Sequence, residues 1–189
     1  NTVGVNSINA VNPSMAMAPD GRFVIAWQSG STAIKYRSFD ADGQPTVASE
    51  VTVASVSGAA SVSNPDVAID NQGRFVITWS EDHDGDETYQ VKARGYNFNG
   101  SVRFITKEVS VGTGQHLNPV IAMAGSGEYV VVWETDQDGT WDIAMRGFTP
   151  FETQRFAQSK ANSIIQGEQR SPDVGMDASG RFVVIWEDD

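Results

Sequence analysis

One pattern of apolar and polar positions recurs four times along the chain. Each copy begins with Asn-Pro or Ser-Pro, continues with a short apolar stretch and a glycine turn, and ends with an aromatic residue, three mostly apolar residues and a tryptophan. The copies occupy residues 12–27, 64–79, 118–133 and 171–186, at intervals of about 53 residues. Repeats of this length are typical of proteins built from stacked, similar structural units.

Each copy predicts a β-hairpin. We expect the first strand to start at the proline, because its missing N–H costs least at the first position of a strand. The glycine, with Asp, Asn or Ser nearby, favours a tight turn. The second strands, expected at 23–27, 75–79, 129–133 and 182–186, are apolar on both faces. Such strands are buried between two layers, which here means one sheet packed against a sheet on either side.

Two further strands follow the hairpin. The third is expected at Ala33–Phe39, Gln90–Tyr96 and Ile143–Phe148, and the fourth at Glu50–Val53, Lys107–Val111 and Arg155–Ser159. Four short antiparallel strands in a repeat of this length are typical of a propeller blade, and no segment has sustained helical periodicity. The sequence therefore predicts an all-β fold, a β-propeller or a propeller fragment. A solenoid or a row of β-sandwiches is the alternative.

The repeats define the expected organisation of one repeat domain over residues 1–189. Residues 1–11 would supply the last strand of a preceding blade, 12–63 are repeat 1, 64–117 repeat 2, 118–170 repeat 3, and 171–189 the first half of repeat 4. One strand of the fourth blade is missing from this count. Closing a ring would require self-association or further repeats of a longer parent chain, and we favour the longer parent.

Composition narrows the range of partners. The net charge of −11 argues against nucleic acid, which binds a basic face, and against an anionic membrane surface. No run of about 18 apolar residues is present, so we expect no membrane insertion. The absence of cysteine excludes disulfides and cysteine-ligated metals. The acidity itself fits either plain solubility or the binding of a cation.

The repeat unit Asn-Pro-x-Val-Ala-Met-Asp-x-x-Gly-x-Phe-Val-Val-x-Trp resembles a tandem propeller-type repeat of large secreted and surface proteins of bacteria. This resemblance covers essentially the whole chain. It implies an extracellular or cell-surface location and a role in adhesion or recognition, with a protein or glycan partner. It implies no reaction.

One acidic loop has the pattern of a calcium site. In residues 134–143, acidic side chains fall at the first, third, fifth and ninth positions, and Gly139 is at the sixth. Alternate carboxylates on a tightly curved loop can converge on one hard cation. The loop is similar to the calcium loop of integrin-type (FG-GAP) propeller repeats. That resemblance implies calcium bound by the side chains of Glu134, Asp136, Asp138 and Asp142 and by the carbonyl of Thr140.

The second repeat contains a weaker copy of this loop. Asp82, Asp84 and Asp86 are its candidate calcium ligands. The alternative for both loops is a solvated hairpin turn, because such turns are rich in Asp and Gly in any case.

The sequence favours a non-enzymatic extracellular recognition or structural module, with calcium as a candidate stabilising ion. We expect no enzyme, because the acidic residues recur with the repeat whereas an active site is usually built once. The first alternative is a lectin-like propeller that binds carbohydrate through Trp141 and Tyr89. The second is a glycoside hydrolase-like domain with a pair of carboxylates. The two histidines, His83 and His116, are expected in loops.

Overall fold

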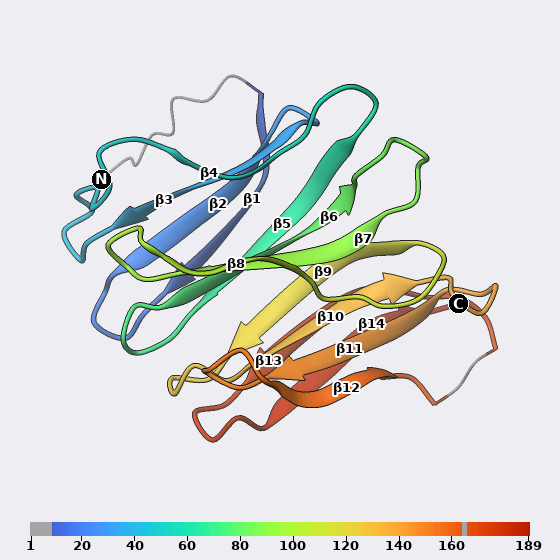
Figure 1. Cartoon of the computed structure of the whole chain (residues 1–189). Helices are drawn as coiled ribbons and strands as arrows, with labels where there is room; N and C mark the ends of the chain where they lie inside the picture. Colours follow the sequence, from blue (N-terminus) through green and yellow to red (C-terminus); the bar gives the residue numbers. More distant parts are fainter. Residues whose placement is uncertain (1–8, 164–165) are drawn as a thin grey trace.

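The computed structural model describes residues 9–163 and 166–189, which form fourteen β-strands (Figure 1). The strands are β1 (Ala10–Met17), β2 (Phe23–Ser29), β3 (Ala33–Phe39), β4 (Val51–Ser55), β5 (Ser61–Ile69), β6 (Phe75–Asp82), β7 (Gln90–Tyr96), β8 (Val102–Glu108), β9 (His116–Met123), β10 (Tyr129–Thr135), β11 (Asp142–Phe148), β12 (Gln154–Lys160), β13 (Gln169–Met176) and β14 (Phe182–Asp188). Across these two ranges there is no helix, and hence none long and apolar enough to cross a membrane.

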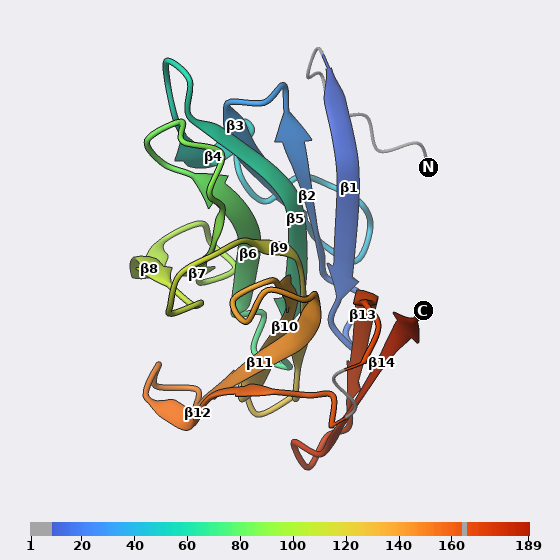
Figure 2. The ribbon, with the colours of Figure 1, turned by 90° about the vertical axis from the view of Figure 1, so that its right-hand side faces the viewer.

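The strands form four antiparallel sheets, each in sequence order: β1–β4, β5–β8, β9–β12 and the two-stranded β13–β14. We call these sheets blades 1 to 4. The first strands of successive blades contact one another, β1 with β5, β5 with β9, and β9 with β13. Figure 2 shows β1 and β13 on one side of the molecule and the outer strands β8 and β12 on the other. The all-β propeller fragment predicted from the sequence is confirmed.

The second strands lie between two layers, as their two apolar faces predict. Every residue of β6 and of β10 is buried, including Trp79 and Trp133. One face of β6 packs on blade 1, where Ile77 joins Val24 and Tyr36. The opposite face of the same strand packs on blade 3. The core of the molecule is therefore a series of face-to-face contacts between blades.

The expected starts of the first strands were wrong. The strands begin before the proline, at Ala10, Ser61, His116 and Gln169, and the Asn-Pro or Ser-Pro pair forms a β-bulge within each. A bulge leaves one residue outside the ladder, so the absent N–H of proline costs no hydrogen bond there. Residues 1–8, which held the expected strand of a preceding blade, lie outside the described residues. Ala10 and Val11 belong to β1.

The third strands agree with the prediction, but one fourth strand does not. β8 covers Val102–Glu108, whereas Lys107–Val111 was expected. After Glu108 the chain turns inward: Val109 is fully buried, and the amides of Val109 and Ser110 both donate to the carbonyl of Val91. The apolar residues at positions 109 and 111 continue the alternation that is typical of a strand, although β8 and its pairing with β7 end at Glu108.

A glycine lies beneath an aromatic ring in two of the blades. Gly95 on β7 faces the ring of Phe104 on β8, and Gly147 on β11 faces Phe156 on β12. A Cβ on either glycine would overlap the ring. Blade 1 fills the same space differently, with a hydrogen bond of 2.7 Å between the hydroxyls of Ser38 and Thr46. The glycine and the phenylalanine are thus one packing unit.

We predict that Gly95→Ala destabilises the chain by about 1–3 kcal/mol, because overpacking must displace the Phe104 ring. The matched control is Gly175→Ala on β13, where an added Cβ meets nothing within 4 Å and the other repeats carry alanine. Urea unfolding of both variants measures the difference. Equal stability of the two variants would contradict this packing.

Candidate functional site

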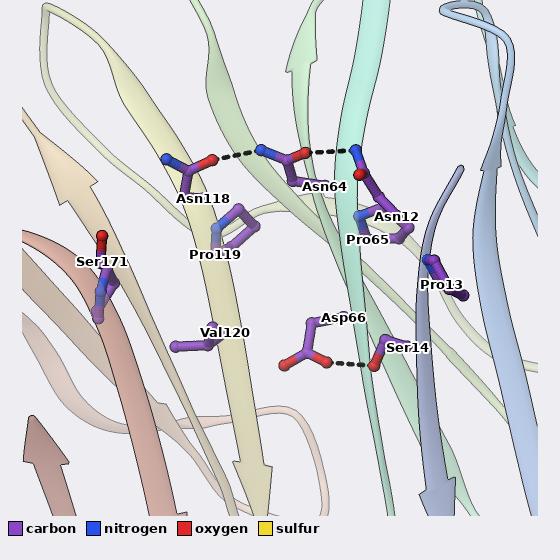
Figure 3. Close-up of a pocket in the computed structure, with 11 residues that line it drawn as sticks. Asn12, Pro13, Ser14, Asn64, Pro65, Asp66, Asn118, Pro119, Val120 and Ser171 are labelled. Carbon is purple, nitrogen blue, oxygen red and sulfur yellow. Dashed lines mark hydrogen bonds between the residues drawn. The ribbon is translucent and has the colours of Figure 1, made fainter.

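The Asn-Pro or Ser-Pro bulges of the four blades surround one pocket on the axis, with a volume of about 450 Å³ (Figure 3). Its lining is Asn12, Pro13, Ser14, Asn64, Pro65, Asp66, Asn118, Pro119, Val120, Ser171 and Pro172. Blades 1 to 3 thus contribute three residues each from the bulge of the first strand, and blade 4 contributes the two that open its bulge. The pocket combines amide groups, proline rings and the side chain at the position after proline.

A ladder of asparagine side chains crosses the pocket (Figure 3). Asn12 Nδ2 donates to Asn64 Oδ1 at 2.8 Å, and Asn64 Nδ2 donates in turn to Asn118 Oδ1. These residues have φ of 49°, 49° and 51°, in the left-handed region that asparagine tolerates better than most residues. Asparagine therefore has two roles in the repeat. It adopts the left-handed backbone conformation of the bulge, and its side-chain amide forms hydrogen bonds between blades.

Asp66 links three blades. Its Oδ1 accepts hydrogen bonds from the hydroxyl of Ser14 in blade 1, at 2.5 Å, and from the amide of Val67. Its Oδ2 accepts from the amide of Ile121 in blade 3, at 2.8 Å. The bulge turns this side chain toward the axis, where it lines the pocket. A carboxyl group at the centre of the molecule is thus held in one orientation.

Burial raises the pKa of Asp66 above its ordinary value of 3.8. The negative charge of Asp173 raises it further, while the hydrogen bonds from Ser14, Ile121 and Val67 act in the opposite direction. Asp173 follows Pro172 in blade 4 as Asp66 follows Pro65 in blade 2, and it is exposed. The pocket therefore holds one acid with a raised pKa, and a second acid lies close enough to influence it.

Sequence reasoning missed this pair. The position after proline is occupied by Ser14, Asp66, Val120 and Asp173, so it varies in a motif that is otherwise nearly constant. That variation was the signal in the sequence that could have identified Asp66 and Asp173. It is typical of a position whose backbone is fixed by the repeat while its side chain is not.

Among the predicted calcium ligands, the structure brings together those of the second repeat. Asp82, Asp84 and Asp86 each offer a carboxylate oxygen, and these oxygens lie within 4.8 Å of one another. In the described ranges this is the one such group of three or more metal-ligating side chains. Asp82 also accepts hydrogen bonds from the amides of Gly85 and Glu87, which is how a tight turn is held. Calcium at this loop stays a prediction.

The third-repeat loop instead pairs its acids with groups of the protein. Glu134 accepts from Arg170 Nη1 at 3.0 Å and from the amide of Ser171. Lys160 lies 2.6 Å from Asp142 and 2.8 Å from Asp138. The remaining members are Asp136, which accepts from the amide of Gln115, and Thr140, which is exposed. The geometry thus favours the second-repeat loop over the third for a cation.

The two candidate ligand-binding aromatics are each engaged within the protein. The guanidinium of Arg170 lies 3.5 Å above the ring of Trp141, so one face of that ring is covered. The hydroxyl of Tyr89 forms a hydrogen bond of 2.6 Å with Ser61. The two residues belong to different loops, away from the axial pocket lining. Their role in glycan binding stays a prediction.

His116 was expected in a loop, and this was wrong. It is the first residue of β9 and is fully buried, where its Nδ1 accepts a hydrogen bond of 3.1 Å from Trp133 Nε1. Burial lowers its pKa from the ordinary value of 6.5. His83 lies exposed beside Glu81. His116 is thus part of the core of blade 3.

No protein-family model and no curated protein matches the chain, but its fold matches solved structures. The α-L-arabinofuranosidase of Fusarium graminearum gives a TM-score of 0.64 at 9% identity, over 97% of this chain and 58% of that one. A family 117 glycoside hydrolase of Zobellia galactanivorans gives 0.53 at 10% identity, over 92% and 64%. The endo-arabinase of Bacteroides thetaiotaomicron gives 0.53 at 13% identity, over 92% and 68%.

These comparisons overturn the prediction of a non-enzymatic module. These three structures are glycoside hydrolases, so a repeating architecture is no argument against an enzyme. The chain spans 58% of the length of the arabinofuranosidase, and at such low identity the likeness establishes the fold alone. The bacterial surface repeat and the integrin-type loop stay resemblances of sequence.

We predict that the two neighbours of Asp66 shift its pKa in opposite directions. Asp173→Asn removes a negative charge and lowers the pKa, whereas Ser14→Ala removes a hydrogen bond to the carboxylate and raises it. Carboxyl carbon chemical shifts measured by NMR across pH report both changes. A pKa that does not fall in Asp173→Asn would show that the two acids do not interact.

We predict that His116 makes the fold less stable in mild acid. Because its folded pKa lies below the unfolded value of 6.5, the unfolded chain binds the proton first as pH falls. Stability is then lost below about pH 6.5, by up to about 1.4 kcal/mol per pH unit. Relative to wild type, His116→Gln should lose less stability between pH 7 and pH 5, because the titrating imidazole is absent. His83→Gln, at an exposed site, is the control and should leave the slope unchanged.

Proposed function

We propose that the chain is part of a glycoside hydrolase whose active site lies in the axial pocket. The observation that carries this proposal is Asp66, an acid with a raised pKa that lines the pocket and is held by donors from three blades. The likeness of the fold to three glycoside hydrolases supports it.

Asp66 acts as the general acid. A general acid must hold its proton at the working pH, and burial together with the charge of Asp173 favours the protonated form of Asp66. It gives this proton to the oxygen of the glycosidic bond as the bond to the anomeric carbon breaks. The leaving sugar departs as an alcohol, and Asp66 is left as a carboxylate.

Asp173 acts as the base. Its carboxyl group is exposed and accessible to water. A water molecule attacks the anomeric carbon and passes a proton to Asp173 as the new C–O bond forms. Solvent then returns a proton to Asp66 and removes one from Asp173, so that each cycle consumes one water per bond cleaved.

The pocket lining suits a sugar. Four proline rings provide apolar surface for the C–H faces of a pyranose or furanose, and the asparagine amides provide donors and acceptors for its hydroxyls. We take α-L-arabinofuranosides as the first substrate class, because two of the similar structures are named for activity on arabinose-containing substrates. Since polymeric glycans of this kind do not cross membranes, we also propose that the chain works outside the cell.

We expect this chain to release arabinose from arabinobiose or arabinan, and we expect Asp66→Asn to lower kcat by about 10²–10⁴-fold. Reducing-sugar release measures the rate, and circular dichroism checks that the variant is folded. Glu108→Gln, an exposed acid on the outer strand β8, is the control and should keep full activity. Full activity in Asp66→Asn would refute the assignment, as would wild-type chain that cleaves no arabinofuranoside.

A further inference from the structure

The asparagine ladder of the axial pocket stops at blade 3. Asn12 Nδ2 donates to two oxygens, Gln28 Oε1 at 3.0 Å and Asn64 Oδ1 at 2.8 Å. Asn64 Nδ2 donates in turn to Asn118 Oδ1. In the part of the chain that the structure describes, Asn118 Nδ2 donates to no group of the protein. The ladder therefore ends in an amide whose N–H donors are unused.

One replacement in the repeat causes this break. Repeats 1 to 3 have asparagine at this position, and repeat 4 has Ser171. The backbones are alike, because all of these residues have φ between 49° and 52°. The side chain of serine is shorter than that of asparagine. Figure 3 shows the amide nitrogen of Asn118 pointing away from Asn64, on the side where Ser171 lies, with no hydrogen bond between Asn118 and Ser171. We call the space between these two side chains the ladder gap.

Contacts between blades 3 and 4 hold the ladder gap open. The amide of Ser171 donates to Glu134 Oε1 at 2.8 Å, and Arg170 Nη1 donates to the other oxygen of this carboxylate at 3.0 Å. Glu134 belongs to β10 of blade 3 and is only 3% exposed. These bonds fix the start of β13 against blade 3. The separation of Ser171 from Asn118 is therefore a property of two neighbouring blades.

The donor at the ladder gap is oriented in advance. The bond from Asn64 to Asn118 Oδ1 fixes the plane of the Asn118 amide, so its nitrogen has one direction. Hydrogen bonds in a row also polarise one another, which strengthens the last donor of the row. A group that is already fixed loses little conformational freedom when a ligand binds to it. The end of the ladder is thus suited to hold a ligand atom.

The groups at the ladder gap define the chemistry of that ligand atom. Asn118 and Ser171 both line the axial pocket. The amide nitrogen can only donate, whereas the serine hydroxyl can donate and accept. A ligand hydroxyl satisfies both groups, because its oxygen accepts one hydrogen bond and its hydrogen is donated in another. An anionic ligand is disfavoured, because it would meet the acids Asp66 and Asp173 in the same region.

We propose that Asn118 and Ser171 bind one hydroxyl of the neutral sugar whose glycosidic bond is cleaved at Asp66. This inference rests on the proposed function and adds to it two residues that determine specificity. Asn118 Nδ2 donates to the oxygen of the hydroxyl, and the hydroxyl donates to Ser171 Oγ. The bound sugar thus takes the place of the missing asparagine. A sugar without this hydroxyl leaves the donors of Asn118 unpaired, which a site of this kind rejects.

The experiment closes the ladder gap with the residue that the other repeats carry. In Ser171→Asn, we expect the new amide oxygen to accept from Asn118 Nδ2, so that the ligand hydroxyl loses its site. The ligand is methyl 1-thio-α-L-arabinofuranoside, whose sulfur resists hydrolysis. We expect its Kd to rise about 3–10-fold, which corresponds to the loss of one hydrogen bond. NMR titration measures the Kd, and the side-chain amide signals of Asn118 should shift when the wild-type chain binds the thioglycoside.

Two controls separate a lost hydrogen bond from other effects. Ser179→Asn is the same replacement in the exposed hairpin turn of blade 4, and it should bind the thioglycoside like wild type. Monodeoxy derivatives of the thioglycoside identify the hydroxyl, because the derivative that lacks it should bind wild type and Ser171→Asn equally. An equal loss of affinity for every derivative would show that asparagine merely crowds the pocket, and would overturn the assignment. Thermal unfolding checks the fold of Ser171→Asn, which asparagine should support, because it tolerates a φ of 52° better than serine does.

The outcomes are distinct from those of the hydrolase assay. Wild-type chain that binds the thioglycoside through Asn118 but cleaves no arabinofuranoside would refute the hydrolase and support the binding site. Wild-type chain that cleaves arabinan, together with a Ser171→Asn variant that binds the thioglycoside equally well, would overturn the binding site and leave the hydrolase. Wild-type chain that does not bind the thioglycoside would also overturn the binding site.

Discussion

The face-to-face packing of the second strands is the constraint on which the rest of the molecule depends. A sheet of four short strands has two faces, and one blade alone can bury neither. Each blade covers one face of the next, so that β6 and β10, which have a blade on either side, are buried along their full length. The tryptophan that ends each repeat motif anchors these contacts, as Trp79 and Trp133 do in the interior. Each blade therefore depends on its neighbours for the burial of its own faces.

This packing also determines where chemistry can occur. The first strands converge at the axis, and the Asn-Pro bulges of blades 1 to 3 place the following side chains, Ser14, Asp66 and Val120, in the lining of the shared pocket. The asparagine ladder fixes the bulges relative to one another. The repeat therefore supplies a rigid backbone, and the residue after proline supplies the difference between blades. The raised pKa of Asp66 follows from that geometry, since burial at the axis and the charge of Asp173 both disfavour a negative charge on Asp66.

The strands were predictable because their signals are local. Alternation, glycine turns and the two apolar faces of residues 75–79 are readable from neighbouring residues, and the structure bears them out. The features that were missed depend on contacts between distant residues. The side chain of Asn64 is bonded by the amides of other blades, and buried His116 accepts a hydrogen bond from Trp133. The amide of Val109 donates to the carbonyl of Val91 instead of continuing the strand. The acidic loop of residues 134–143 likewise has the spacing of calcium ligands, but Glu134 pairs with Arg170 and Asp142 pairs with Lys160. Spacing along the sequence cannot reveal these partners, because they come from other strands.

The number of acidic residues with a structural role explains why the sequence led to a wrong prediction about function. The acids Asp70 and Asp177 in the hairpin turns of blades 2 and 4 accept hydrogen bonds from amides of their own turn and are structural. The argument against an enzyme assumed that all the acids were of this kind. Asp66 and Asp173 stand in the same two blades as these turn acids, but Asp66 lines the axial pocket, at a position where Ser14 and Val120 stand in blades 1 and 3. An array of similar blades becomes asymmetric at its axis through the side chains of this position. A single site can therefore be built once inside a structure that repeats everywhere else.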